Sequence, residues 1–235
     1  MNEYLYNALI AFLQFLYTIF IVALTDKLVK KKVISQGLSR KIVHMWAGGM
    51  VLFWPLYEGT TAPYFFCVTP GIWIGLLIYV AMTKGPDDPT VRSMTRTGDP
   101  KELLRGVLYF PVMTIVLTLV FWHGTPLGKD QFPALAGIAA VGFGDGLAPI
   151  FGQYAKRHIE IWKGVKKSGL GSLGMFLGSL ISIPTLSYVV LGYLPELWKI
   201  LFIVLVATLV EFLSYKDVDN LIVAFMVALV AYLIV

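Results

Sequence analysis

Apolar runs of membrane-spanning length alternate with short polar segments along nearly the whole chain. A helix needs about 20 mostly apolar residues to cross roughly 30 Å of hydrocarbon. Eight runs approach that length, at residues 4–24, 42–57, 62–82, 103–122, 133–151, 171–191, 195–213 and 221–235. The second and last runs are short and glycines interrupt the fifth. The pattern therefore predicts an all-α, polytopic membrane bundle of about eight transmembrane helices, with seven and nine as alternatives.

Composition supports a bilayer as the solvent. The 235 residues are 57% hydrophobic and 14% charged, and the mean hydropathy is +0.76, which exceeds what a soluble domain of this length tolerates. The longest polar stretches, 84–105 and 153–169, are too short to fold alone, so we expect one integral membrane domain over residues 1–235. The first apolar run lacks a basic leader and a cleavage site, and we interpret it as a retained helix, which favours a prokaryotic cell membrane.

The basic residues gather in alternate loops. Segments 26–41, 84–105, 156–167 and 214–220 hold 17 of the 19 Lys and Arg residues. By the positive-inside rule, these loops face the cytoplasm and both termini lie outside. The net charge of +5 therefore does not require nucleic acid as a partner, and membrane lipid head groups and nucleotide phosphates are the expected anions.

An ionisable residue inside a spanning segment is costly and marks a candidate functional site. Asp145 lies in GFGDGLAPIFG, near the cytoplasmic end of the fifth run. The flanking glycines permit close backbone approach and unusual dihedral angles, which suits a carboxylate that meets a phosphate or a metal ion. The alternative is a hydrogen-bonded Asp in a packing helix.

The segment KKSGLGSLG follows a basic loop and leads into the sixth run. Lysine charge, serine hydroxyls and backbone N–H groups at a helix start favour phosphate. A flexible basic loop with an N-cap serine is the alternative. The candidate phosphate ligands in this segment are Lys166, Lys167, Ser168, Gly171 and Ser172.

Oxygen ligands cluster where the seventh run ends and the eighth begins. Glu211, Asp219 and Asn220 are candidates for holding Mg²⁺ on nucleotide phosphates. Asp217, between them, is interpreted as a solvated loop residue. His123 and His158 have no metal-ligand companions in the sequence and are also interpreted as solvated.

Basic residues near the second run offer a further phosphate site. Arg40 and His44 share a helical face, with Lys41 beside them; membrane-anchoring charges and a packed histidine are the alternative. The 84–105 segment is predicted to be an ordered re-entrant or surface loop with a short helix at 101–105. Arg92, Arg96 and Arg105 are positioned there for a nucleotide or for lipid head groups.

Read in order, SRKIVHMWAGG, SMTRTGDPKELLRG, GDGLAPIFG, KKSGLGS and VEFLSYKDVDN resemble the membrane-bound phytol kinase and polyprenol (dolichol-type) kinase family, most closely its phytol kinase branch. The resemblance runs from about Ser39 to Val223. The chain departs from the family pattern at Pro149, where an acidic residue is usual, and at Ala224, where a proline is usual.

The resemblance implies CTP-dependent phosphorylation of a membrane isoprenoid alcohol with Mg²⁺ or another divalent cation; UTP and ATP are alternative donors. It assigns catalytic roles to Asp145, Lys167, Glu211 and Asp219, three of which are also candidate metal ligands: Asp145, Glu211 and Asp219. The implied nucleotide- and phosphate-binding residues are Arg40, Lys41, His44, Arg96, Lys166, Ser168, Gly171, Ser172 and Asn220.

Two other functions remain open from the sequence. A cytidylyltransferase that makes a CDP-activated lipid would use the same nucleotide, metal and membrane. A transporter would use Asp145 for ion coupling, but inverted repeats and midplane polar residues, which are typical of transporters, are not visible in the sequence. The sequence also leaves open whether Asp145 orients the alcohol or binds the metal, and whether the protein forms a homodimer.

Overall fold

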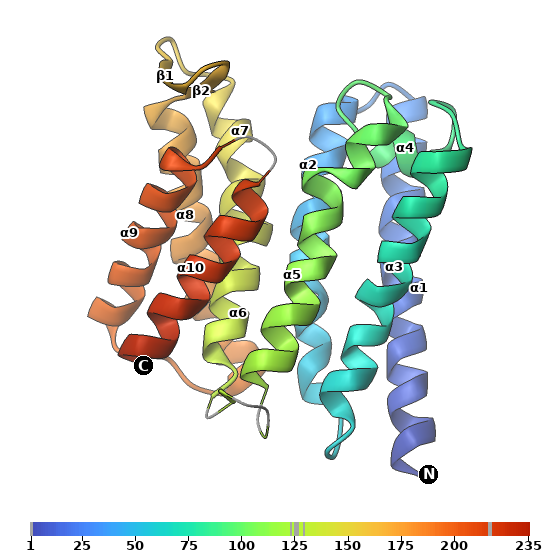
Figure 1. Ribbon diagram of the computed structural model, residues 1–235, viewed down its shortest axis with the longest axis vertical. Coiled ribbons are helices and arrows are strands. Elements are labelled where there is room, and N and C mark those ends of the chain that lie inside the picture. The colour runs from blue at the N-terminus through green and yellow to red at the C-terminus, as the bar shows by residue number, and fades with distance from the viewer. Residues whose placement is uncertain (1, 123, 125–126, 129, 216–217) are drawn as a thin grey trace. The chain divides into compact units, whose positions relative to one another are not determined.

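The computed structural model describes residues 2–122, 124, 127–128, 130–215 and 218–235 (Figure 1). Asp217 and His123 lie outside the described residues. Internal packing divides the chain into two compact units, Met1–Leu119 and Val120–Val235. A compact unit is not by itself an independent domain, so the single domain over residues 1–235 stays a prediction.

The regular elements in the described residues of the first unit are all helices. Its elements are α1 (Glu3–Lys30), α2 (Gln36–Gly48), the 3₁₀ helix η1 (Gly49–Leu56), α3 (Ala62–Thr83), α4 (Pro89–Met94), the 3₁₀ helix η2 (Pro100–Leu104) and α5 (Gly106–Phe121), which runs across the division. The prediction of one spanning α-helix over 42–57 is wrong, because this region consists of α2 followed by η1. The helix starts earlier, because the Ser35 hydroxyl caps α2 by accepting from the Leu38 N–H at 3.2 Å, and it changes to 3₁₀ geometry at Gly49.

Helix α1 buries polar side chains and exposes apolar ones. Asn7 and Gln14 are fully buried, whereas Phe12 and Phe20 are more than half exposed. The buried side chains bond to neighbouring elements: Asn7 Nδ2 donates to the Glu58 carbonyl at 2.8 Å, and Trp73 Nε1 donates to Thr18 Oγ1 at 2.7 Å. Polar groups turned inward and apolar groups turned outward are what a helix in lipid requires.

The segment between α3 and α5 is ordered, as predicted. Val91 and Met94 of α4 and Leu103 of η2 join a buried cluster with residues of α1 and α3. The predicted short helix at 101–105 is confirmed as η2, but α4 was not predicted. This segment and the α1–α2 connection lie at the same end of the unit, away from its amino terminus (Figure 1), so the two basic loops of this unit share one end.

The second unit contains five α-helices, two π-helical segments and a short β-hairpin within its described residues. These are α6 (Phe132–Ala139), the π segment η3 (Ala140–Asp145), α7 (Gly146–Gly152), β1 (Ile159–Trp162), β2 (Val165–Lys167), α8 (Gly169–Leu186), the π segment η4 (Ser187–Leu191), α9 (Leu197–Leu213) and α10 (Asp219–Ile234). Helix α8 packs against α7, η3 and α9, and α10 packs against α6 and α9.

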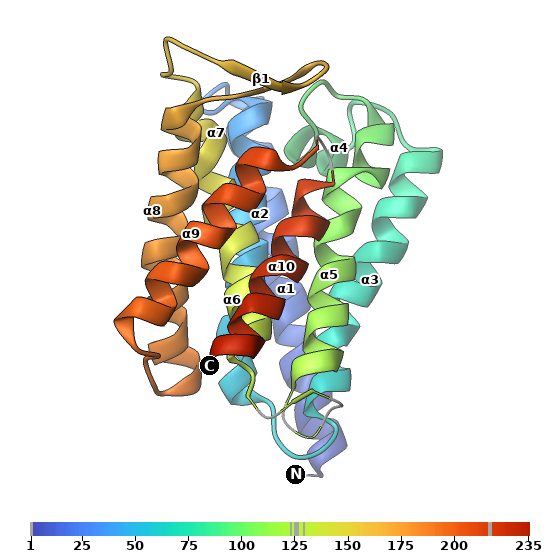
Figure 2. The same cartoon turned by 60° about the vertical axis from the view of Figure 1, so that its left-hand side comes forward.

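The hairpin was not predicted, since 156–167 was interpreted as a basic loop. The two strands pair antiparallel, with Glu160 opposite Lys166, and Gly164 occupies the turn at φ +78°. Trp162 Nε1 donates to the Leu213 carbonyl at 2.8 Å, which ties β1 to the end of α9. The hairpin lies at the end of the unit where α9 finishes and α10 begins (Figures 1 and 2).

Glycines bring η3, α7 and α8 into close contact. A Cβ on Gly178 would lie 2.5 Å from the Phe143 carbonyl oxygen, and one on Gly174 would lie 2.8 Å from that of Leu147. Small residues allow helix backbones to approach closely in membranes. Gly144 has the same role, because a Cβ there would meet Ser179 Oγ at 2.4 Å. Neither Gly144 nor Gly146 has a positive φ, so the expectation of unusual dihedral angles beside Asp145 is wrong.

Five helical segments of the described chain are long and apolar enough to cross a membrane, judged by length and composition. They are Glu3–Lys30, Ala62–Thr83, Pro100–Phe121, Phe132–Gly152 and Gly169–Leu191; the apolar helix Asp219–Ile234 is shorter. This pattern agrees with a helical, polytopic membrane protein. The count of eight spans and the outward placement of both termini stay predictions.

Candidate functional site

A buried ion pair joins two of the predicted catalytic residues. Lys167, the last residue of β2, donates through Nζ to Glu211 Oε1 near the end of α9. The two side chains are 14% and 7% exposed. The hairpin and α9 thus bring together residues that are 44 positions apart, and the pair lies at the end of the unit that also holds the amino ends of α8 and α10.

Two more carboxylates lie near this pair. Asp145 and Asp219 both interact electrostatically with Glu211, and Asp145 is 8% exposed. Asp145 ends the π segment η3, and π segments inside α-helices frequently occur at functional sites. The second unit therefore gathers Lys167 with three acidic residues that the sequence identified separately.

The amino end of α8 has the predicted serine cap. Ser168 Oγ accepts from the Gly171 N–H at 3.1 Å, and the hydroxyl-bearing residue is buried. A Cβ on Gly171 would lie 3.2 Å from Ser168 Oγ and 3.4 Å from the Ala148 carbonyl oxygen. Gly171 thus keeps the start of α8 close to α7. Ser172 follows in the first turn of α8, its N–H donating to the Ser168 carbonyl at 3.0 Å.

Lys166 is not brought to this cluster. Side chains alternate between the two faces of a strand, and in β2 Val165 is buried, Lys166 is exposed and Lys167 is half-buried. Lys166 pairs in register with Glu160 on the solvent side of the hairpin. Lys166 was predicted to bind phosphate together with the catalytic Lys167 because no strand was foreseen here.

Asn220 and Asp219 begin α10. Asn220 is buried, Asp219 is half-buried, and the Asn220 N–H contacts Asp219 Oδ1 at 3.1 Å. Acidic and amide side chains at a helix start lie in the favourable field of the helix dipole. The position also leaves Asp219 close enough to Glu211 for the two carboxylates to interact electrostatically.

The chemistry of these oxygens suits a magnesium ion that is shared with phosphates. Within the described residues, no group of three or more His, Cys, Asp or Glu side chains is arranged to hold a metal ion by itself. Mg²⁺ in nucleotide sites is usually held by one or two carboxylates and by the phosphates. Asp145 and Asp219 are carboxylates that fit that requirement, and Glu211 pairs with Lys167.

The remaining predicted residues belong to the first unit. Arg40, Lys41 and His44 lie in α2, each of them half-buried, and Arg96 is exposed after α4. The His44 ring packs on Phe110, with 4.7 Å between ring centroids. Arg40 interacts electrostatically with Glu102, whose carboxylate accepts from the Arg96 N–H at 2.8 Å.

Sequence reasoning missed a second charged cluster, which holds the first unit together. Asp26, near the end of α1, is 6% exposed; it accepts from Arg92 Nε at 2.6 Å and pairs with Lys30 Nζ at 2.9 Å. Arg92 was expected to reach a nucleotide or lipid head groups, and its guanidinium instead fixes α4 to α1. The acidic residue Asp26 at the end of a long apolar helix was the sequence feature that could have predicted this contact.

The chain is similar to curated plant kinases over most of its length. It is 37% identical over 223 residues to "Probable phytol kinase 1, chloroplastic" of Oryza sativa subsp. japonica, covering 89% of this chain and 68% of the relative. It is 34% identical over 219 residues to "Phytol kinase 1, chloroplastic" of Arabidopsis thaliana, covering 88% and 70%. "Farnesol kinase, chloroplastic" of Arabidopsis thaliana is 31% identical over 216 residues, with coverage of 87% and 68%.

No family model and no solved structure matches the chain. The relatives nonetheless decide the family, because the identity exceeds 30% and the aligned region covers more than two thirds of both proteins. The resemblance inferred from the five motifs is confirmed: this chain belongs to the phytol kinase family.

Proposed function

We propose that the protein transfers the γ-phosphoryl group of CTP to the hydroxyl of a membrane isoprenoid alcohol such as phytol, geranylgeraniol or a longer polyprenol. The observation that carries this proposal is the cluster of Lys167, Glu211, Asp145 and Asp219 in a member of the phytol kinase family. Relatives named for phytol and for farnesol support an isoprenoid alcohol as the acceptor, and leave its length open.

The chemistry asks mainly for positioning and charge neutralisation, since phosphoryl transfer needs little covalent help from the protein. In the proposed mechanism Lys167 binds phosphate oxygens of the donor, and the capped start of α8 offers backbone N–H groups to the same anion. Glu211 holds the Lys167 ammonium in place until the nucleotide arrives. Asp145 orients the acceptor hydroxyl or receives its proton, or else binds the metal ion.

Mg²⁺, when bound, would neutralise the triphosphate, with Asp145 and Asp219 as its protein ligands and Glu211 as a third if Lys167 moves to the phosphates. Ser168, Gly171, Ser172 and Asn220 would line the phosphate side of this site. Lys166, which is exposed, is proposed to attract the nucleotide by its positive charge without contacting the phosphates. CTP is the proposed donor because of the family resemblance, and ATP and UTP are the alternatives to be tested.

Arg40, Lys41, His44 and Arg96 are proposed to bind phosphate from the first unit, and residues 1–235 are proposed to constitute one kinase domain. We further propose that the basic loops face the cytoplasm of a prokaryotic cell, although the named relatives are chloroplastic. Membrane lipids would surround the helices. The alternation of basic and non-basic loops is what supports this orientation.

The decisive assay incubates the purified protein with CTP, ATP or UTP and a panel of isoprenoid alcohols. A prenyl monophosphate together with CDP is the expected pair of products. Pyrophosphate together with a CDP-lipid would replace the kinase with a cytidylyltransferase. Absence of any lipid product with every donor and every alcohol would refute both.

A further inference from the structure

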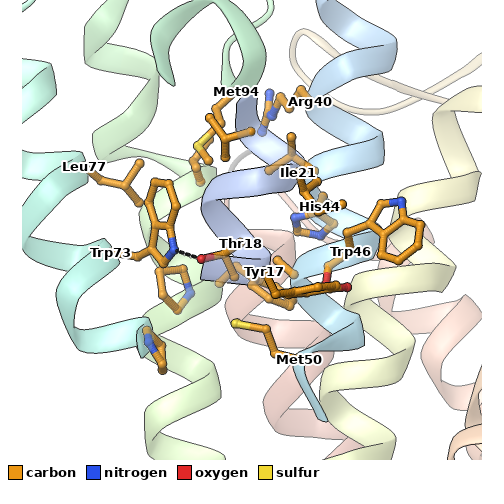
Figure 3. A pocket seen from close by; sticks show the side chains of 17 residues that line it. Tyr17, Thr18, Ile21, Arg40, His44, Trp46, Met50, Trp73, Leu77 and Met94 are labelled. Carbon is orange, nitrogen blue, oxygen red and sulfur yellow. Dashed lines mark hydrogen bonds between the residues drawn. The ribbon is translucent and has the colours of Figure 1, made fainter. Parts of the chain in front are cut away.

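An apolar pocket opens inside the first unit. It has a cavity volume of about 70 Å³, and its lining comes from α1, α2, η1, α3, α4 and α5. A cavity needs at least about 10–15 Å³ of such volume to hold a single water, so there is room for a branched hydrocarbon segment but not for a whole twenty-carbon chain. Figure 3 shows the lining side chains.

The pocket has a cationic side chain at one end. Arg40 and Met94 lie toward one end in Figure 3, and Met50 lies toward the other. His44 is one turn along α2 from Arg40 and packs against Phe110. Arg40 also interacts electrostatically with Glu102. Two other polar groups of the lining bond to protein: Thr18 Oγ1 accepts from Trp73 Nε1 at 2.7 Å, and Tyr17 donates to the Trp46 carbonyl at 3.0 Å.

Two prolines explain why space exists here. Pro70 lies inside α3 and Pro111 inside α5, and both line the pocket. A proline inside a helix cannot donate to the carbonyl four residues earlier and pushes the helix away from it. Helices interrupted on facing sides cannot pack as closely as regular ones, and methionine side chains, which adapt their shape, line part of the gap.

We infer that this pocket binds the part of an isoprenoid chain next to its head group, and that Arg40 and His44 meet the hydroxyl of the alcohol and the phosphate of the product. The inference rests on the proposed function and adds the place where the acceptor binds. It also assigns the phosphate that Arg40 contacts to the lipid rather than to the nucleotide.

Shape and charge favour this occupant over an ordinary phospholipid. The irregular walls formed by Ile21, Val43, Met50 and the two prolines suit a chain with a methyl branch at every fourth carbon better than a straight acyl chain. A cationic guanidinium at one end matches the dianionic phosphate of a prenyl monophosphate. A straight-chain phospholipid is the competing source of hydrocarbon, and the experiment separates the two.

The first test fills the pocket. Ala47 lines it, and Ala47→Phe would occupy the space of one chain segment. Because a hydrophobic pocket discriminates about 10–200-fold per methylene group, we expect kcat/KM for phytol to fall at least about tenfold while the KM for CTP stays unchanged. Ala23→Phe, on the exposed face of α1, is the matched control and should leave both unchanged.

The second test uses the polar end. Arg40→Gln should raise the Ki for inhibition by phytyl monophosphate about tenfold or more, with no change in the KM for CTP. A raised KM for CTP with an unchanged Ki would place Arg40 on the donor and overturn this part of the inference.

The third test needs no variant and therefore does not depend on variant folding. A geranylgeraniol analogue with a diazirine near its hydroxyl should crosslink to residues 40–50, and excess phytol should prevent the crosslink. An acyl-diazirine phospholipid that labels the same residues and resists phytol would overturn the inference. If the protein phosphorylates phytol but only other segments are labelled, the inference is overturned and the kinase function stands. If residues 40–50 are labelled but no alcohol is phosphorylated, only the kinase function is refuted.

Discussion

Breaking the ion pair between Lys167 and Glu211 should affect stability and catalysis in separable ways. The pair is buried, with 14% and 7% of the side chains exposed. Removing one member of a buried pair typically costs about 3–5 kcal/mol because the other charge is left uncompensated. The slight exposure of Lys167 places the expected loss for Lys167→Met at about 3 kcal/mol, or a fall of about 6–12 °C in Tm for a chain of this length.

The double variant Lys167→Met/Glu211→Gln should recover most of that stability, since no unpaired buried charge remains. Catalysis should not recover. A charged hydrogen bond is worth about 1.5–3 kcal/mol, so the loss of Lys167 should raise the KM for CTP about ten- to hundredfold in both variants. The KM for phytol should change much less.

Thermal unfolding in detergent and steady-state kinetics with CTP and phytol measure the two effects. Lys30→Met is the matched control, because the Lys30 side chain is 54% exposed and its partner Asp26 remains paired with Arg92; its cost should stay below about 1 kcal/mol. A double variant that regains full activity along with stability would show that Lys167 acts only in folding, and would refute the reasoning.

Three further outcomes are expected. Asp145→Asn should lower kcat at least about a hundredfold with expression and Tm near those of the original protein; an Asn variant that retains most activity would make Asp145 structural. Gly178→Ala should lower Tm, because its Cβ would meet the Phe143 carbonyl at 2.5 Å, whereas Gly71→Ala, with no atom within 4 Å, should not. In a chain with Cys67 replaced by Ser, a cysteine at Lys163 should be labelled only from the cytoplasmic side, and labelling from outside intact cells would reverse the proposed topology.

Length and hydropathy were sufficient to locate the apolar helices. Each of the eight predicted runs contains helix, and α3 begins at Ala62 as predicted. Boundaries failed where a cap outweighed hydropathy: the second apolar run was predicted to begin at residue 42, yet the Ser35 cap starts the helix earlier. The error arose because a charged helix end and a charged loop have the same composition.

The sequence of the hairpin contains a recognisable strand pattern, but the density of basic residues favoured a loop. Ile159 and Ile161 alternate with polar residues, and Lys163-Gly164 forms a two-residue turn before Val165, which is a recognisable hairpin pattern. The density of lysine and arginine in this segment favoured a loop instead. Missing the strand also affected the predicted site, because only the alternation along the strand distinguishes the exposed Lys166 from the half-buried Lys167.

The pocket of the first unit was beyond the reach of sequence patterns. Its walls come from helices that are distant in the chain, and no local period marks a side chain as lining a cavity rather than packing. Pro70 and Pro111 were the available hint, since each interrupts an apolar helix, but whether two interruptions face each other depends on how the helices pack.

The surroundings of Asp145 were predicted only in part from the sequence. The sequence indicated a costly charge among glycines and explained the glycines by backbone freedom. In the structure, Gly144 allows close packing with α8. The backbone irregularity at Asp145 is instead the π segment that ends there. An α-helix advances about 100° per residue, and a π segment adds residues to a turn, so it changes the direction in which the next side chains project. Helix α6 can therefore pack with one face while Asp145, at the end of the π segment, interacts electrostatically with Glu211.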